Sequence, residues 1–157
     1  MKFPASFLIL SLVVLFACKK DKYTDEPQVS IKSISPSEVR QGTNGSYTVL
    51  SLDAKFTDQQ GDIDSILFIT KYYDGDVATY TDTTFRTPLA GLNLPKNTRQ
   101  GDITVQFEYN TNNSQGQYLT FPGVTKDTTA TLGLIMIDAA AHRSAFAESP
   151  KIRLIAP

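Results

Sequence analysis

Apolar residues follow two different patterns along the chain. From Phe7 to Ala17 they form an eleven-residue run that only Ser11 interrupts. From Gln28 onward they alternate with polar residues in short segments separated by turn-forming residues, and no window has a convincing helical period. Alternation with a period of two is typical of a strand that buries one face. The pattern therefore predicts an all-β domain over residues 28–157, preceded by a segment of another kind.

The clearest strand is expected over Ser46–Phe56, with Leu52 and Phe56 on the buried face. Thr128–Ile137 is nearly continuous in β-branched and apolar residues, which is typical of a central strand covered on both faces. Arg86–Leu94, with prolines nearby, is expected to be irregular or an edge segment. The other expected strands are Gln28–Ile34, Ser65–Tyr73 joined through an Asp-Gly-Asp turn to Val77–Thr84, Asp102–Tyr109, Gln117–Phe121 and Lys151–Ile155.

Seven or eight short strands at spacings near ten residues predict an antiparallel β-sandwich of immunoglobulin-like size. Hydrophobic residues make up 41% of the 157-residue chain and charged residues 20%, a balance that supports one packed core. The chain is therefore expected to fold as a single domain behind its amino-terminal segment.

The amino-terminal segment reads as an export signal. Lys2 supplies the positive start, and the apolar run that follows is too short for a membrane span, which needs about 20 residues. At its end, Leu15-Phe16-Ala17-Cys18 resembles the bacterial lipobox. The resemblance implies that residues 1–17 are removed, that the Cys18 sulfur receives a diacylglyceryl group, and that the new amino terminus is acylated. Two or three acyl chains anchor a protein stably in a membrane.

Residues 18–27 are expected to be the lipidated cysteine and a solvated tether. Lys19–Pro27 is mostly charged, shows no apolar periodicity, and reaches roughly 30 Å when extended. A charged stretch directly after the cysteine also resembles the surface-export signals of Bacteroidetes lipoproteins. The tether is long enough to hold the domain clear of the lipid headgroups.

Two motifs within the domain resemble known bacterial sequences. Phe56–Ile63 (FTDQQGDI) is similar to a strand-to-loop signature in immunoglobulin-like domains of Bacteroidetes lipoproteins. Ile137–Ser144 (IDAAAHRS) is similar to an Asp-x-x-Gly-Asn-x-Ser hairpin of bacterial immunoglobulin-like domains, with Ala141 and His142 in place of Gly and Asn. These resemblances imply an immunoglobulin-like fold and an outer-membrane location in the cell envelope. They imply no reaction.

Composition removes several function classes. Fifteen basic and 16 acidic side chains give a formal charge of −1, so the electrostatic footprint of a nucleic-acid binder is missing. One cysteine excludes internal disulfides and thiolate zinc clusters, and one histidine excludes a multi-histidine metal site. His142 is the only candidate base for a Ser-His-Asp arrangement, and no Gly-x-Ser-x-Gly elbow accompanies it. No catalytic residues are expected, and the protein is not expected to be an enzyme.

Asp58, Asp62 and Asp64 are the best candidate metal ligands, because Ca²⁺ prefers six to eight oxygen ligands and a loop can place several carboxylates on one side. The alternative is turn chemistry alone, since Asp and Gly are also preferred in turns for their backbone hydrogen bonds and dihedral tolerance. Calcium is thus the only cofactor that the sequence suggests.

The leading functional hypothesis is a non-enzymatic lipoprotein, held in the membrane through Cys18, that presents an immunoglobulin-like module to a protein or envelope partner. The rival is a carbohydrate-binding accessory lipoprotein. The two are distinguished by whether aromatic residues cluster on an exposed sheet face or loop rim, or instead pack in the core. The aromatic candidates are Tyr72, Tyr73, Tyr80, Tyr109, Tyr118 and Phe121.

Overall fold

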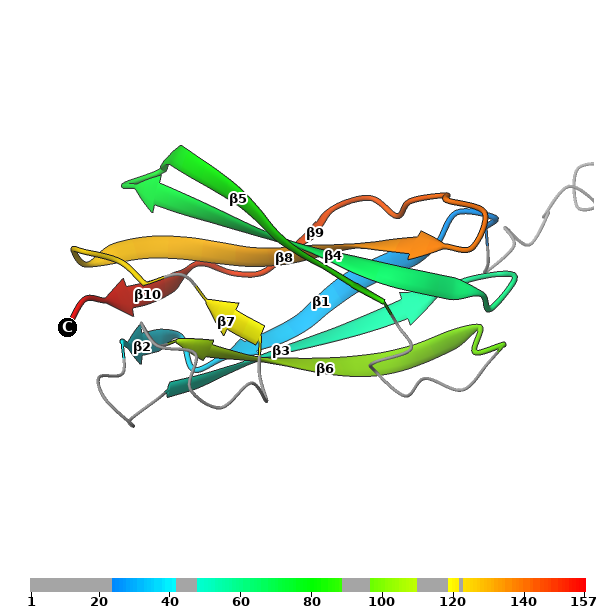
Figure 1. Ribbon diagram of the computed structural model, residues 1–157, viewed down its shortest axis with the longest axis horizontal. Helices are drawn as coiled ribbons and strands as arrows, with labels where there is room; N and C mark the ends of the chain where they lie inside the picture. Colours follow the sequence, from blue (N-terminus) through cyan, green and yellow to red (C-terminus); the bar gives the residue numbers. More distant parts are fainter. Residues whose placement is uncertain (1–23, 42–47, 89–96, 110–118, 122) are drawn as a thin grey trace, which may run out of the picture.

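The computed structural model describes residues 24–41, 48–88, 97–109, 119–121 and 123–157, and for residues 83–88, 120 and 121 it describes the backbone alone. These residues form strands and connecting turns with no helix, which confirms the all-β prediction (Figure 1). The strands are β1 (Gln28–Ser35), β2 (Glu38–Arg40), β3 (Thr48–Thr57), β4 (Ile63–Asp74), β5 (Val77–Pro88), β6 (Gln100–Tyr109), β7 (Leu119–Phe121), β8 (Thr128–Asp138), β9 (Ala147–Glu148) and β10 (Ile152–Ile155).

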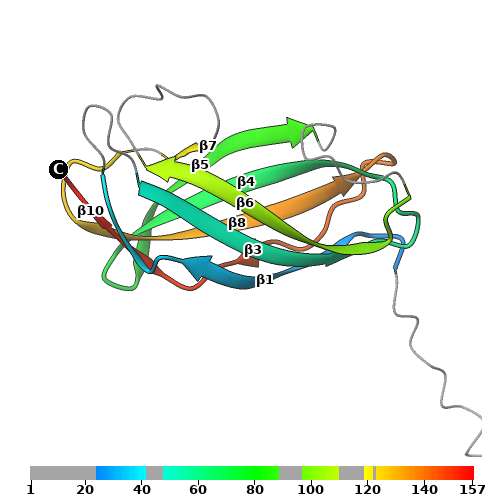
Figure 2. The same cartoon turned by 90° about the horizontal axis from the view of Figure 1, so that it is seen from below.

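The strands build two sheets that face each other (Figures 1 and 2). One sheet has the order β1-β3-β6-β7, and the other has the order β2-β10-β8-β4-β5 with β9 added beside β8. The chain changes sheet between β1 and β2, where Pro36 ends the pairing of β1 with β3. Two pairs, β2 with β10 and β6 with β7, are parallel, so the expectation of antiparallel pairing throughout is wrong for these short strands.

The core lies between the two sheets and follows the alternation read from the sequence. Leu52 and Phe56 on β3 are 0% and 1% exposed, which confirms their predicted burial. Phe68 of β4 and Phe107 of β6 meet edge to face across the core, with ring centroids 5.4 Å apart. Eight of the eleven residues of β8 are buried and the other three are half-buried, as predicted for a central strand, and β8 lies between β10 and β4.

Several boundaries differ from the sequence prediction. Strand β5 continues to Pro88, so the first three residues of the segment expected to be irregular or an edge belong to an edge strand; residues 89–94 lie outside the described part of the chain. Strands β2 and β9 were not predicted, because three and two residues are too few to show an alternating pattern. Cys18 and residues 19–23 of the tether also lie outside the described residues. The described residues contain no helix that is long and apolar enough to cross a bilayer.

Strand β9 is held in place by the carboxylate of Glu148, which accepts three hydrogen bonds. Glu148 accepts hydrogen bonds from the Lys71 ammonium at 2.8 Å, the Tyr73 hydroxyl at 2.8 Å and the Thr131 hydroxyl at 2.6 Å. Partial burial raises the pKa of Glu148, but the three hydrogen bonds together outweigh burial and hold the pKa below its ordinary value. The ionised carboxylate therefore fastens β9 to β4 and β8.

We expect Glu148→Gln to lower the free energy of unfolding at pH 7 by about 1 kcal/mol, a modest loss because the side chain is partly exposed. The folded pKa lies below the ordinary value of 4.5, so the stabilisation is present above pH 4.5 and is lost as the pH falls through the folded pKa. Urea unfolding at pH 7 and pH 3 measures both effects. Between pH 7 and pH 3 the unmodified protein should lose more stability than the variant. Equal losses would show that the ionised Glu148 carboxylate does not stabilise the fold.

Candidate functional site

The two ends of the sandwich carry different chemistry (Figure 1). At one end β1 begins, β3 passes into β4, and β8 terminates, so the turns 58–62 and 138–143 lie where the chain enters the domain. We call this the entry end. At the opposite end lie the β4–β5 hairpin, the start of β8 and the carboxyl terminus, and we call this the distal end.

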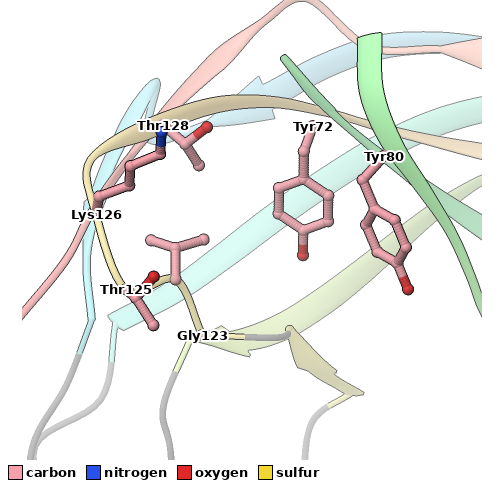
Figure 3. A pocket seen from close by; sticks show the side chains of 7 residues that line it. Tyr72, Tyr80, Gly123, Thr125, Lys126 and Thr128 are labelled. Carbon is pink, nitrogen blue, oxygen red and sulfur yellow. The ribbon is translucent and has the colours of Figure 1, made fainter. Parts of the chain in front are cut away.

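A pocket of about 310 Å³ opens at the distal end (Figure 3). The hairpin contributes Tyr72 and Tyr80, which are directly paired across β4 and β5 with ring centroids 5.8 Å apart and ring planes 32° apart. The segment leading into β8 forms the other side. Figure 3 shows the two phenol rings side by side, across from Thr125, Lys126 and Thr128. Gly123 and Val124 complete the lining.

The segment before β8 is fixed by a buried glutamine. Gln41 is 5% exposed, and its Oε1 accepts a hydrogen bond from the Val124 N–H at 3.3 Å. Gly123 lies against the same side chain, since a Cβ there would come within 2.6 Å of Gln41 Nε2. Val124 packs on the core cluster. The wall opposite the tyrosines is thus positioned by core packing and by Gln41.

The pocket offers aromatic faces and neutral hydroxyl groups. Tyr80 is 59% exposed and Tyr72 is half-buried. Burial raises the pKa of Tyr72, with a further contribution from the negative charge of Asp82, so its phenol stays protonated at neutral pH. Lys126 supplies a cation on the opposite wall. The Tyr72 hydroxyl itself is inaccessible to solvent. The surface can therefore stack on a flat apolar group, and the exposed Tyr80, Thr125 and Lys126 side chains can donate hydrogen bonds to its polar edge.

The other predicted aromatic residues do not join this surface. Tyr109 is fully buried in the core. Tyr73 is half-buried, with its hydroxyl on Glu148 and the Lys151 ammonium 4.7 Å from its ring centroid. Tyr118 and the side chain of Phe121 lie outside the described part of the structure. Among the described candidates, the exposed aromatic pair is Tyr72 with Tyr80.

At the entry end, the acidic residues are grouped differently from the sequence prediction. Asp58 and Asp62 come together as expected, but the third carboxylate beside them is Asp138, with one oxygen of each residue within 4.8 Å of the others. Asp64 is not in this group. It is an exposed residue of β4, at the irregularity where the pairing of β4 with β8 shifts register.

His142 lies in an exposed turn, as expected, and contacts this carboxylate group from one side. Its Nδ1 is 2.8 Å from Asp138 Oδ2, and the hydrogen bond and charge of Asp138 raise the pKa of His142. The Ser144 hydroxyl, the nearest serine in sequence, donates to the Ala145 carbonyl and accepts from the Met136 N–H. That serine is therefore engaged with the backbone.

No family model and no curated protein matches the chain. Among solved structures, the chain is similar to the alkylpurine DNA glycosylase AlkC of Pseudomonas fluorescens, bound to DNA with an abasic-site analogue, at 12% identity and a TM-score of 0.41. That match covers 83% of this chain and only 31% of the glycosylase. A second match, Northeast Structural Genomics Consortium target SoR45, has 11% identity and a TM-score of 0.40, and covers 84% of this chain and 88% of the target. At these TM-scores neither likeness carries an argument about function.

Proposed function

We propose that this protein is a non-enzymatic envelope lipoprotein whose domain binds a partner through the tyrosine-lined pocket at its distal end. The observation that supports this proposal most is the pairing of exposed Tyr80 with half-buried Tyr72, across an open pocket from Lys126. The described lining residues include no carboxylate, histidine or cysteine, the groups that acid–base or nucleophilic catalysis uses most often. This lining supports binding rather than a reaction.

The arrangement of the domain is consistent with this role. A chain anchored through Cys18 enters the sandwich at one end, and the pocket lies at the other. The lipid anchor and the tether are proposals from the sequence, and with them the outer-membrane location. An anchored domain of this orientation presents its pocket away from the lipid surface.

We further propose that the sandwich is immunoglobulin-like. In that fold one sheet pairs strands A, B and E, and the other pairs G, F and C, with C′ beside C in variable-type domains. Here β1, β3 and β6 occupy the first set of positions, and β10, β8, β4 and β5 occupy the second. The short strand β2, parallel to β10 at the edge of the second sheet, fits the first strand of such a domain divided between its two sheets.

Carbohydrate binding is the second candidate, and the tyrosine pair is the observation that favours it. Aromatic rings bind the apolar faces of sugars, and the Thr125 and Thr128 side chains place hydroxyl groups across from the rings. A glycan in the cell envelope and a protein in the cell envelope are both compatible with such a surface. A glycan partner and a protein partner can be told apart because periodate destroys the first and protease destroys the second.

We expect Tyr80→Ala to abolish retention of the partner on immobilised protein, because the ring is the more exposed half of the pair. The probe is a detergent extract of envelopes from cells that express the protein. Thr81→Ala, an exposed residue next to Tyr80 on β5, is the matched control and should retain binding. Loss after periodate treatment of the extract identifies a glycan, and loss after protease treatment identifies a protein. Equal retention by Tyr80→Ala and the unmodified protein would reject the pocket as the binding site.

We expect Cys18→Ser to abolish incorporation of labelled fatty acid and to shift the protein out of the membrane fraction, because it removes the only thiol in the chain. Metabolic labelling followed by membrane fractionation measures both effects. Lys19→Ala, the next residue, is the matched control. A Cys18→Ser protein that still carries the label would contradict lipid anchoring.

A further inference from the structure

Two aspartate turns meet at the entry end of the sandwich. In the β3–β4 turn, Asp58 Oδ2 accepts a hydrogen bond from the Asp62 N–H at 2.9 Å. In the turn after β8, Asp138 Oδ1 accepts from the His142 N–H at 2.7 Å, which is the same spacing of four residues. The turns are joined by a hydrogen bond of 3.0 Å from the Ala139 N–H to the Asp62 carbonyl. The two motifs that stand far apart in the sequence therefore form one structural unit.

This unit concentrates negative charge in a buried place. Asp58 is 0% exposed, Asp138 is 2% exposed, and each shares the cluster with Asp62. Asp58 Oδ1 and Asp62 Oδ1 are both inaccessible to solvent, and neither accepts a hydrogen bond from the residues that the structure describes. Within the described part of the chain, the basic side chain that pairs with this cluster is His142, and it lies on Asp138.

Something positive is needed to balance these oxygens. A buried carboxylate oxygen without a partner costs several kcal/mol, and carboxylates this close repel one another. Two occupants meet the requirement: a proton shared within the cluster, or a bound cation.

We propose that Asp58, Asp62 and Asp138 together bind one Ca²⁺ ion. Calcium–oxygen distances are about 2.3–2.6 Å, so ligands on opposite sides of the ion lie about 5 Å apart, and oxygens within 4.8 Å of one another fit around it. Mg²⁺ demands near-ideal octahedral geometry and usually keeps several waters, so a group of three protein carboxylates favours Ca²⁺. The all-carboxylate donor set favours a hard cation over Zn²⁺ or Cu⁺. Asp64, an exposed residue of β4 outside this group, is not a ligand.

The ion acts as a clamp between the two sheets. Asp58 follows β3 of the first sheet, whereas Asp62 precedes β4 and Asp138 ends β8 of the second. The same turn contacts the described end of the tether, since the Gln60 amide donates to Asp25 Oδ1 at 3.2 Å. Calcium therefore stabilises the end of the domain at which the chain enters.

The test uses the full chain purified in detergent, melted in 5 mM CaCl₂ and in chelator and followed by circular dichroism. Calcium should raise the melting midpoint by about 5 °C or more, because it binds only the folded arrangement. Asp62→Asn and Asp138→Asn keep the size of each side chain and should lose most of that rise. Asp64→Asn makes the same charge change outside the cluster and should keep it. Calorimetric titration should give one ion per chain for the unmodified protein.

Different results distinguish the occupants. If the cluster holds only a proton, calcium and chelator give equal midpoints, and Asp62→Asn raises the midpoint in both; that result overturns the proposal. A calcium response that survives Asp138→Asn but disappears in Asp64→Asn would assign the ion to Asp58, Asp62 and Asp64 and reject the site proposed here. A response of the same size with Mg²⁺ would reject calcium selectivity.

Discussion

Phe56→Ala is expected to lower the free energy of unfolding by about 3–5 kcal/mol, the largest loss expected from one substitution in this domain. Phe56 is 1% exposed at the end of β3 and belongs to the core between the sheets. Its ring packs on the backbone of β6: a Cβ at Gly101 would lie 2.9 Å from the ring atom Cε1. The truncation leaves a cavity that the paired strands β3 and β6 cannot close without breaking their register.

Urea unfolding of Phe56→Ala measures this loss, and Lys55→Ala is the matched control. Lys55 is the preceding residue of β3, points to the other face of the sheet and is exposed. Its substitution should change the free energy of unfolding by less than about 0.5 kcal/mol. If both variants unfold at the same urea concentration as the unmodified protein, Phe56 does not pack in the core described here.

The strands and their buried faces were predictable because burial on one face leaves a local record in the sequence. Along β3 and β6, alternate residues are apolar and buried; the exception is Glu108 near the end of β6, a charged residue that is also buried. Which strands pair with each other cannot be read from such a local pattern. The parallel pairing of β2 with β10 and the addition of β9 to β8 depend on residues distant in sequence, and the strands are too short for alternation to show.

The candidate calcium ligands illustrate the same limit. Asp58 and Asp62 were predicted because one turn contains both. Asp64 was included because β4 was expected to start at Ser65; the strand starts at Ile63, which pairs with Asp138. That pairing both removes Asp64 from the loop and brings Asp138 to the cluster. A usable signal is present, since each motif has an aspartate near its start, Asp58 and Asp138, but only the sheet register shows that they meet.

The turn after β8 shows why a departure from a family pattern need not change the backbone. Ala141 stands where the resembling motif has Gly, yet its φ is 68°, in the left-handed region that costs an alanine about 1–2 kcal/mol. The hydrogen bonds of Asp138 to the His142 N–H and ring hold the turn in this form. The strength of those contacts was not readable from residue types alone.

The pocket was predictable in part. The Asp74–Asp76 turn indicates the hairpin. The hairpin brings Tyr72 opposite Tyr80, next to a register irregularity between Tyr72 and Tyr73. The opposite wall depends on Gln41, which holds the segment before β8 from a different part of the chain. Long-range contacts of this kind decide whether two aromatic residues form a site or an isolated surface pair.

Gly61→Ala is the second substitution with a large expected effect, a loss of about 2–4 kcal/mol in the free energy of unfolding. Two physical reasons combine. Gly61 has a φ of 71°, which an L-residue adopts only with strain, and an added Cβ would lie 2.7 Å from the backbone carbon of Asn97. The backbone of Asn97 cannot rotate out of the way as a flexible side chain can. The β3–β4 turn must therefore shift to accommodate the added Cβ.

Gly75→Ala separates the two reasons. Gly75 has a similar φ of 60°, but an added Cβ there has no heavy atom within 4 Å. Gly75→Ala should therefore lose only the conformational part, about 1–2 kcal/mol. Urea unfolding of both variants, in chelator to exclude any effect of calcium, gives the difference that the contact with Asn97 contributes. Equal losses for the two glycines would show that the β3–β4 turn yields freely, and a turn that yields freely cannot hold Asp58 and Asp62 in a fixed relation to Asp138.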